Sequence, residues 1–302
     1  MSQQIRCIHC KATNYTKKGF RKTENRGKIQ KYQCTECGQY FTNDEGFYRM
    51  RNCEKIVTMS VDMYLSNLSS RKMRNQLKRH MDTKISHVSV LDWVRKYVLK
   101  VQHYIEKFTP KLSGKFYVDE TDIPRGCNTK KKGGDKFWCC VDWETRYINA
   151  TMYSPKNQSV AEATRFLKKT VKHGKPKFIQ TDAAKFYPKA MRRCFSTNTT
   201  KGFTIGGEKR IGVEHRINNV SKTKKHNVRI ETVFSKIKDR VDDFRGIKAL
   251  WSAPILLAGI VLQHNFIEAH TTTGAIPSEL AGIGYQTGEN RWLELIRVSA
   301  YS

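Results

Sequence analysis

The chain has 302 residues, of which 38% are hydrophobic, enough to bury the core of one large domain with smaller additions. Lysine and arginine together number 56 against 27 acidic residues, a formal net charge of +29 that is spread along the chain. This charge suits a polyanion, and we expect nucleic acid as the partner in preference to the ribosome or an anionic membrane.

No feature of the sequence predicts export or membrane insertion. The opening residues, MSQQIRCIHC, lack the apolar segment of a secretory signal. The longest apolar run, residues 253–262, is shorter than the roughly 20 residues that span a bilayer. Nine cysteines, four of them in paired spacing, favour metal binding in a reducing compartment over disulfides. We therefore expect a cytoplasmic protein that associates with the nucleoid and not with a membrane.

Residues 1–45 contain two C-x-x-C pairs separated by a polar and basic loop. The four cysteines are Cys7, Cys10, Cys34 and Cys37. Each pair can place two thiolates at one edge of a tetrahedral Zn²⁺ site, and Gly38 allows a tight turn beneath the second pair. The loop of 23 residues is long for such a site, but its composition suits a β-hairpin. The pattern predicts a zinc ribbon.

Residues 46–108 predict a helical segment of the helix-turn-helix type. We expect helices at 53–67 and 69–81, and a third that begins with Ser89 as its cap and runs to Ile105. The core positions that we expect are Met73 and Leu77 in the second helix, and Leu91, Val94, Val98, Val101 and Ile105 in the third. Basic side chains face outward, and those expected to contact DNA are Arg74, Lys78 and Arg95. A plain helical linker or a dimerisation helix would give the same apolar spacing.

After the boundary at 109–114 the pattern changes to α/β. The expected elements are strands at 115–123, within 136–154 and at 175–181, and helices at 159–173, 184–195, 227–245 and 252–270. Residues 203–226, basic and glycine-bearing, predict an insertion without a sustained helical stripe.

Three carboxylates stand at the edges of these elements in a chain that has few acids. Asp119 lies in the first strand, Asp182 follows a later strand, and Glu231 lies on the helix after the insertion. Taken singly, each could be a solvated acid, a helix cap or half of a surface ion pair. Brought together, they could hold two Mg²⁺ (or Mn²⁺) ions for attack on a phosphodiester. Lys238 lies two helical turns beyond Glu231, on the same side of the helix, where it could contact DNA.

The motifs around these acids resemble those of the DDE transposases of insertion sequences, which are related to retroviral integrases. The similar segments are YVDET, QTDAAKFY, residues 227–270 and the closing motif IPSELAGI, and the chain looks closest to insertion-sequence family six and its archaeal relatives. The resemblance implies an RNase H-like mixed-sheet catalytic core at 115–270, followed by a C-terminal tail at 271–302. It also implies binding of terminal inverted repeats, DNA cleavage and strand transfer to target DNA by a homo-oligomer.

The third carboxylate departs from the family's spacing. Asp182 and Glu231 are separated by 48 residues, more than is usual in the family, whereas Glu214 lies closer to the usual distance. We favour Glu231, because it begins a strongly amphipathic helix that carries Lys238.

The acids alone support only metal-dependent phosphoryl chemistry. A structure-selective nuclease of the RNase H type is one alternative, and a zinc-ribbon regulator with an inactive core is another. Metal-dependent cleavage would separate the regulator from the two enzymes.

Overall fold

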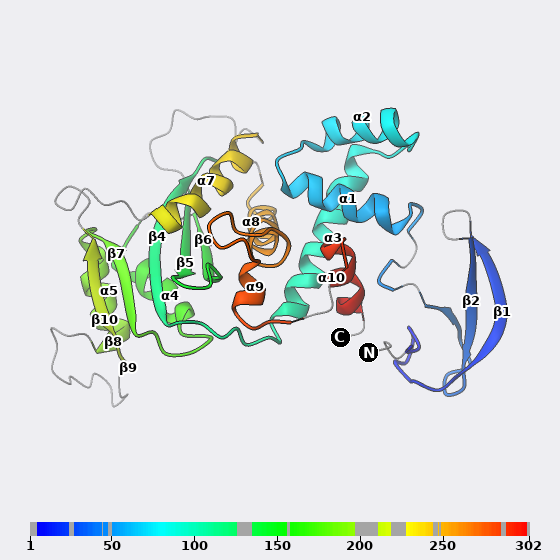
Figure 1. Ribbon diagram of the computed structural model, residues 1–302, viewed down its shortest axis with the longest axis horizontal. Coiled ribbons are helices and arrows are strands. Elements are labelled where there is room, and N and C mark those ends of the chain that lie inside the picture. The colour runs from blue at the N-terminus through cyan, green and yellow to red at the C-terminus, as the bar shows by residue number, and fades with distance from the viewer. Residues whose placement is uncertain are drawn as a thin grey trace. The chain divides into compact units, whose positions relative to one another are not determined.

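A computed structural model describes residues 5–300 except 24–26, 44, 48–49, 126–134, 156–157, 197–210, 219–227, 244–246, 248 and 285–287. The chain divides into two compact units (Figure 1). One unit comprises Met1–Tyr64, Ser70–Glu106 and Gln286–Ser302, and the other comprises Leu65–Ser69 and Lys107–Tyr285. Among the described residues, no helix combines the length and apolar character needed to cross a membrane.

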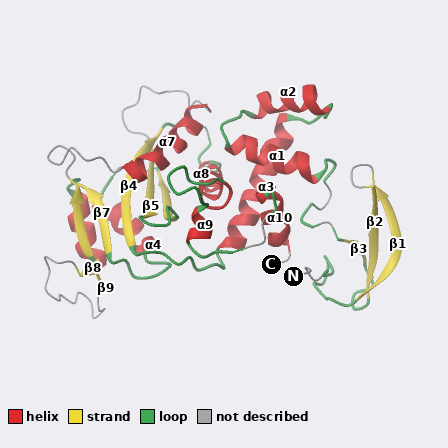
Figure 2. Cartoon of the chain, in the orientation of Figure 1, coloured by secondary structure: helices red, strands yellow, loops and turns green. Residues whose placement is uncertain are grey.

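The N-terminal segment forms a three-stranded antiparallel sheet. Its strands are β1 (Tyr15–Thr23), β2 (Gly27–Cys34) and β3 (Tyr40–Thr42), in the order β1-β2-β3 (Figure 2). The aromatic rings of Tyr15, Tyr32 and Phe41 pack together beside the cysteines, with Tyr32 and Phe41 stacked at a centroid distance of 5.5 Å. The basic loop between the two cysteine pairs is thus the β-hairpin that its composition indicates.

Three helices follow, and the third differs from the sequence prediction in its cap and in two of its expected core positions. The helices are α1 (Glu54–Leu65), α2 (Ser70–Met81) and α3 (His87–Ile105). Met73 and Leu77 are buried as predicted. The cap of α3 is Ser86 and not Ser89, because the Ser86 hydroxyl accepts the Ser89 amide at 3.0 Å. The buried positions of α3 are Val90, Trp93, Val94, Tyr97, Val98 and Val101, so the predicted Leu91 and Ile105 are only half buried.

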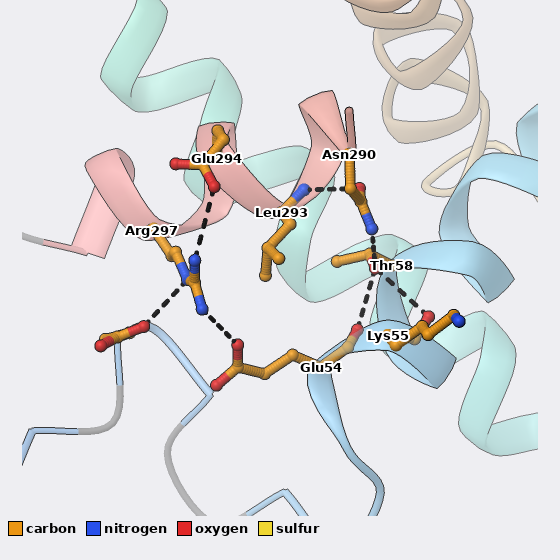
Figure 3. Close-up of polar contacts among 8 residues, drawn as sticks. Glu54, Lys55, Thr58, Asn290, Leu293, Glu294 and Arg297 are labelled. Atoms are coloured by element: carbon orange, nitrogen blue, oxygen red, sulfur yellow. Dashed lines mark hydrogen bonds and ion pairs between the residues drawn. The ribbon is translucent and has the colours of Figure 1, made fainter. Parts of the chain in front are cut away.

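The end of the chain returns to this helical unit as helix α10 (Arg291–Ala300), whose Trp292 and Ile296 are buried. Arg297 lies within 2.9, 2.8 and 3.4 Å of carboxylate oxygens of Glu45, Glu54 and Glu294, respectively. Figure 3 shows Arg297 between Glu54 and Glu294, and Asn290 beside Thr58, whose hydroxyl accepts a hydrogen bond from the Asn290 amide at 2.8 Å. The last residues of the chain therefore help to hold α1 in place.

The second unit is built on a five-stranded mixed sheet. Its strands are β4 (Lys115–Ile123), β5 (Asp135–Asp142), β6 (Ile148–Ser154), β7 (Phe178–Asp182) and β10 (Glu214–Asn218), in the order β10-β7-β4-β5-β6. The pairs β10-β7 and β7-β4 are parallel, and the pairs β4-β5 and β5-β6 are antiparallel. The predicted mixed sheet is confirmed. Strand β10 was missed, because it lies inside the stretch that the sequence predicted as an irregular insertion. Strands β8 (Phe195–Ser196) and β9 (Ile211–Gly212) form a separate short pair.

Helices cover both faces of this sheet (Figure 1). One face, named here the α5 face, packs against α4 (Val160–Thr170) and α5 (Phe186–Cys194). The opposite face, the α7 face, packs against α7 (Val228–Asp243) and α8 (Ala253–Leu262). Because side chains alternate along a strand, each residue of β4 is committed to one face.

The predicted helix at 252–270 changes character after Leu262. Residues Gln263–Ile267 form a π-helix, η1, and a short helix α9 (Pro277–Leu280) follows. The Asn265 side chain accepts from the Ile148 amide at 2.9 Å and donates to the Ile148 carbonyl oxygen at 3.0 Å. The Asn265 side chain therefore pairs with the free edge of β6 in the manner of a neighbouring strand.

Candidate active site

Neighbouring acids on β4 point to opposite faces of the sheet. Val118 belongs to the core cluster of the α5 face, so Glu120, two residues on, lies on that face as well. Asp119 pairs across the ladder with Cys139, which belongs to the cluster of the α7 face. The fold therefore presents Asp119, and not Glu120, toward α7.

Asp182 lies on the same face as Asp119 and at the same level. The parallel ladder between β4 and β7 ends with the pair Tyr117 and Gln180, and continuing its register by two residues places Asp119 level with Asp182. Ile179 packs on the α5 face, so alternation puts Asp182 on the α7 face. Helix α5 is capped at Lys185 without a side-chain hydrogen bond. Asp182 instead accepts the Ala184 amide at 3.0 Å, so it is not the cap of that helix.

The third predicted ligand, Glu231, lies exposed in the first turn of α7, which packs against β4. Burial raises the pKa of Asp119 to about 7, and the negative charges of Glu120, Asp182 and Glu231 add to the increase. The amide of Glu120 donates to Asp119 and acts in the opposite direction. The structure therefore brings Asp119, Asp182 and Glu231 within electrostatic reach of one another.

Glu120 is occupied by contacts on the α5 face. Its carboxylate accepts a hydrogen bond from the Tyr187 hydroxyl and another from the Gln158 amide at 2.5 Å. Burial raises the pKa of Glu120 to about 7, against the effect of these two donors. Glu120 is therefore held by side-chain contacts and is not a freely solvated neighbour of Asp119. Asp122, the other neighbour, is exposed and pairs with Lys136 at 2.6 Å.

Glu214, the rival for the third position, lies at the far end of its strand. It pairs with Phe178, whereas Asn218 of the same strand pairs with Asp182. Four residues of strand correspond to roughly 13 Å. Arg216 donates to both carboxylate oxygens of Glu214, at 2.8 and 2.9 Å, and this contact lowers the pKa of Glu214.

The predicted DNA-contacting residues are all at least partly open to solvent. Lys238 is exposed on α7, two turns after Glu231. Arg74 and Lys78 are exposed on α2, where Arg74 donates to the neighbouring Asn75 side chain at 3.1 and 3.2 Å. Arg95, on α3, forms an ion pair with Asp92 at 3.2 Å.

The four predicted cysteine ligands meet in one cluster, and their sulfur atoms all lie within 4.8 Å of one another. Gly38 has a φ of +69°, so it supplies the turn that places Cys37 beside Cys34. Hydrogen bonds from the backbone amides of Cys37 and Glu36 help to lower the pKa of Cys34 to about 7. Four thiols in one cluster, one of which has a lowered pKa, fit a tetrahedral Zn²⁺ site.

The three acids offer the oxygen ligands that the divalent ions expected from the sequence prefer, but among the described residues the four cysteines are the only group whose ligand atoms gather closely enough to hold a metal. Mg²⁺ and Mn²⁺ prefer oxygen ligands, and three carboxylates supply them without nitrogen or sulfur. Burial, with a smaller contribution from the neighbouring negative charges, raises the pKa of Asp119, and a divalent cation would favour its charged form.

Comparison with known proteins gives one sequence-level match. Residues 129–270 match the family model for the DDE domain of IS240-type transposases. Asp182 and Glu231 lie inside the matched range, and Asp119 lies ahead of it. No curated protein matches the chain.

Among solved structures the likeness is distant. The chain is 12% identical to the simian T-cell lymphotropic virus intasome in complex with PP2A regulatory subunit B56 gamma, covering 76% of this chain and 74% of that one, with a TM-score of 0.40. It is 12% and 11% identical to the trimeric and dimeric forms of the HTLV-2 integrase catalytic core domain in complex with magnesium. Those two matches cover 58% of this chain and 98% and 97% of theirs, with TM-scores of 0.35 and 0.36. Likeness at this level assigns no activity.

Proposed function

On the premise that the chain is an enzyme with a DDE domain of the insertion-sequence transposase type, we propose that it moves an insertion sequence. It would cut DNA at the element's ends and join the freed 3′-hydroxyl groups to target DNA. The observation that carries this proposal is the placement of Asp119, Asp182 and Glu231. Three segments far apart in the sequence supply one carboxylate each to the same face of the sheet.

We assign the metal-binding role to these three carboxylates. Bound Mg²⁺ or Mn²⁺ would supply Lewis-acid stabilisation of the charge that develops on the reacting phosphate. The acids fix where the scissile phosphate sits, because they are held on a strand, at a strand end and on a helix. Lys238, exposed two turns after Glu231, is placed to hold the backbone of the same strand.

We assign recognition of the terminal inverted repeats to the N-terminal segments. These are the zinc ribbon, residues 1–45, and the helical segment, residues 46–108, which contributes Arg74, Lys78 and Arg95 toward DNA. Both ends of an element must be held during one reaction, so the proposal includes a homo-oligomer assembled on DNA. Support comes from the exposed basic face of α2 and from the connection of α2 to α3 by the short segment 82–86.

The experiment is incubation of the purified chain with DNA that carries the element's own ends, with and without Mg²⁺. A transposase gives nicked ends and, with target DNA added, joined products. Cleavage without joining would favour the structure-selective nuclease. Binding without any Mg²⁺-dependent cleavage would favour the regulator with an inactive core.

A further inference from the structure

A cluster of aromatic rings lies on the α7 face, next to the proposed catalytic acids. Tyr117 precedes Asp119 by two residues on β4, so the two side chains leave the same face about 7 Å apart. The Tyr117 ring stacks on Trp143 at a centroid distance of 4.8 Å and meets the edge of Phe178 at 6.4 Å. The aromatic rings of Tyr117, Trp143 and Phe178 therefore lie beside the proposed active site.

Three guanidinium groups from different elements pack against these rings. Arg216 of β10 lies 3.8 Å from the centre of the Phe178 ring. Arg229 of α7 lies over Trp143 and donates to its carbonyl oxygen at 2.9 Å. Arg146, in the turn between β5 and β6, lies 5.8 Å from the same indole. All three positive charges act on the Tyr117 hydroxyl, whose pKa burial raises and these arginines lower.

Arg146 is buried, and the described residues around it satisfy only part of its hydrogen-bonding capacity. The residue is only 9% exposed, yet its Nε and Nη1 atoms have no hydrogen-bond partner among the described residues. Each buried donor left in this state costs about 1–3 kcal/mol. Its φ of +62° adds backbone strain, which L-residues avoid. Buried donors of this kind point to a missing acceptor.

The acids near the cluster leave positive charge uncompensated. Glu214 forms an ion pair with Arg216 through two hydrogen bonds, so the charge that remains is that of Arg146 and Arg229. Asp142, whose charge acts on Arg146, already accepts hydrogen bonds from Ser113 and Thr145. Burial, together with the charge of Arg146, lowers the pKa of Arg229 to about 10. An anion placed between Arg146 and Arg229 would relieve their repulsion.

We propose that Arg146, Arg216 and Arg229 form a phosphate site for the DNA strand whose neighbouring phosphate reacts at Asp119. Guanidinium groups match phosphate oxygens in a two-pronged geometry, and stacking on Trp143 and Phe178 fixes their planes. The separation of about 7 Å between Tyr117 and Asp119 allows one strand to contact both sites. This inference rests on the proposed function for the identity of the strand, but the phosphate site itself does not require catalysis.

The test uses the full chain with Ca²⁺ in place of Mg²⁺ and a fluorescent duplex that carries the element end. Arg216→Gln and Arg229→Gln are partly exposed positions suited to substitution, and Arg193→Gln, exposed on α5, is the matched control. Each site variant should bind about tenfold more weakly and reduce the log–log salt slope by about 0.9, the value for one phosphate contact. The control should keep the wild-type slope.

A neutral methylphosphonate, placed at one linkage at a time, then identifies the phosphate. At one linkage, the methylphosphonate should weaken DNA binding by the wild type but cause no further loss of binding by Arg229→Gln. This result is expected if that phosphate and Arg229 are the two partners of a single contact. The site would be overturned if both variants kept the salt slope of the wild type. It would also be overturned if the loss of binding from the methylphosphonate and the loss from Arg229→Gln were additive at every linkage. Stabilisation of the wild type by inorganic phosphate with unchanged DNA binding in the variants would also overturn it, since the site would then serve a free anion. Failure of the transposase proposal appears separately, as the absence of Mg²⁺-dependent products from wild-type protein.

Discussion

The cysteine cluster and the carboxylate cluster are both suited to metal ions, but they are assembled in opposite ways. Two tight turns in one small sheet bring the four sulfur atoms within 4.8 Å. The carboxylates of Asp119, Asp182 and Glu231 come from two strands and a helix of a large unit, and its core must form before they meet. The ribbon should therefore depend on its metal for folding, and the acid site should depend on its fold for metal binding.

The largest effect should come from breaking the ribbon. Cys34→Ala should remove bound zinc and unfold residues 1–45, because zinc binding supplies roughly 10–16 kcal/mol in small zinc domains. The five-stranded unit should remain folded. Elemental analysis and limited proteolysis measure both outcomes. Cys194→Ala, outside the cluster, is the control, and full zinc content in Cys34→Ala would contradict the assignment.

The second-largest effect should be the difference in DNA cleavage between variants of the adjacent acids Asp119 and Glu120 on β4. Asp119→Asn should reduce DNA cleavage on the order of a thousandfold, about 4 kcal/mol in the activation barrier, with little change in melting temperature. Glu120→Gln should lower the melting temperature, through its contact with Tyr187, and retain most cleavage. Cleavage rates under single-turnover conditions and thermal melts test the pair. Equal loss of cleavage in both variants would show that the face assignment is wrong.

Acid should destabilise the core unit through His264, which is buried with Nε2 against the Arg146 carbonyl oxygen. Burial lowers its pKa from 6.5 to about 4. Below pH 6.5 the unfolded chain takes up a proton that the folded chain refuses, so stability falls as pH drops from 6.5 to 4. The slope from this residue is about 1.4 kcal/mol per pH unit. Denaturant titrations of wild type and His264→Gln should show a flatter pH dependence in the variant, and identical slopes would refute this assignment.

The smallest effect concerns the C-terminal helix. Arg297→Ala should destabilise the helical unit by about 1–2 kcal/mol, because it leaves Glu45 and Glu54 without their shared partner. Arg291→Ala, on the same helix, should have a smaller effect. Hydrogen exchange in α1 is the readout, since α1 carries Glu54. Unchanged exchange in Arg297→Ala would mean that α10 contributes no support through this ion-pair network.

The sequence predicted the ribbon and most core elements because their signals are local. Paired cysteines, apolar spacing and turn residues each act over a few positions, and strand β4 was predicted at its observed bounds. The carboxylates were predicted only with help from family motifs, since spacing alone favoured Glu214. Separating Asp119 from Glu120 required knowing which face of β4 is buried against which helix.

The features that sequence reasoning missed depend on long-range contacts. Strand β10 exists because β7 offers it an edge, and its own residues carry little apolar alternation. Helix α10 belongs with helices that precede it by about 200 residues, and no local pattern encodes that return. The arginine and aromatic cluster combines β4, β7, β10, α7 and a turn, so no single motif predicts it.

The central claim, that Glu231 completes the catalytic carboxylates, is tested most directly by comparing Glu231→Gln with Glu214→Gln. Both variants are assayed for cleavage and joining of the element's ends in Mg²⁺ and in Mn²⁺, with folding checked by thermal melts. We expect Glu231→Gln to lose cleavage on the order of a thousandfold in Mg²⁺, and Glu214→Gln, whose carboxylate lies roughly 13 Å along β10, to retain most of it. Near-normal cleavage by Glu231→Gln with loss in Glu214→Gln would contradict the assignment.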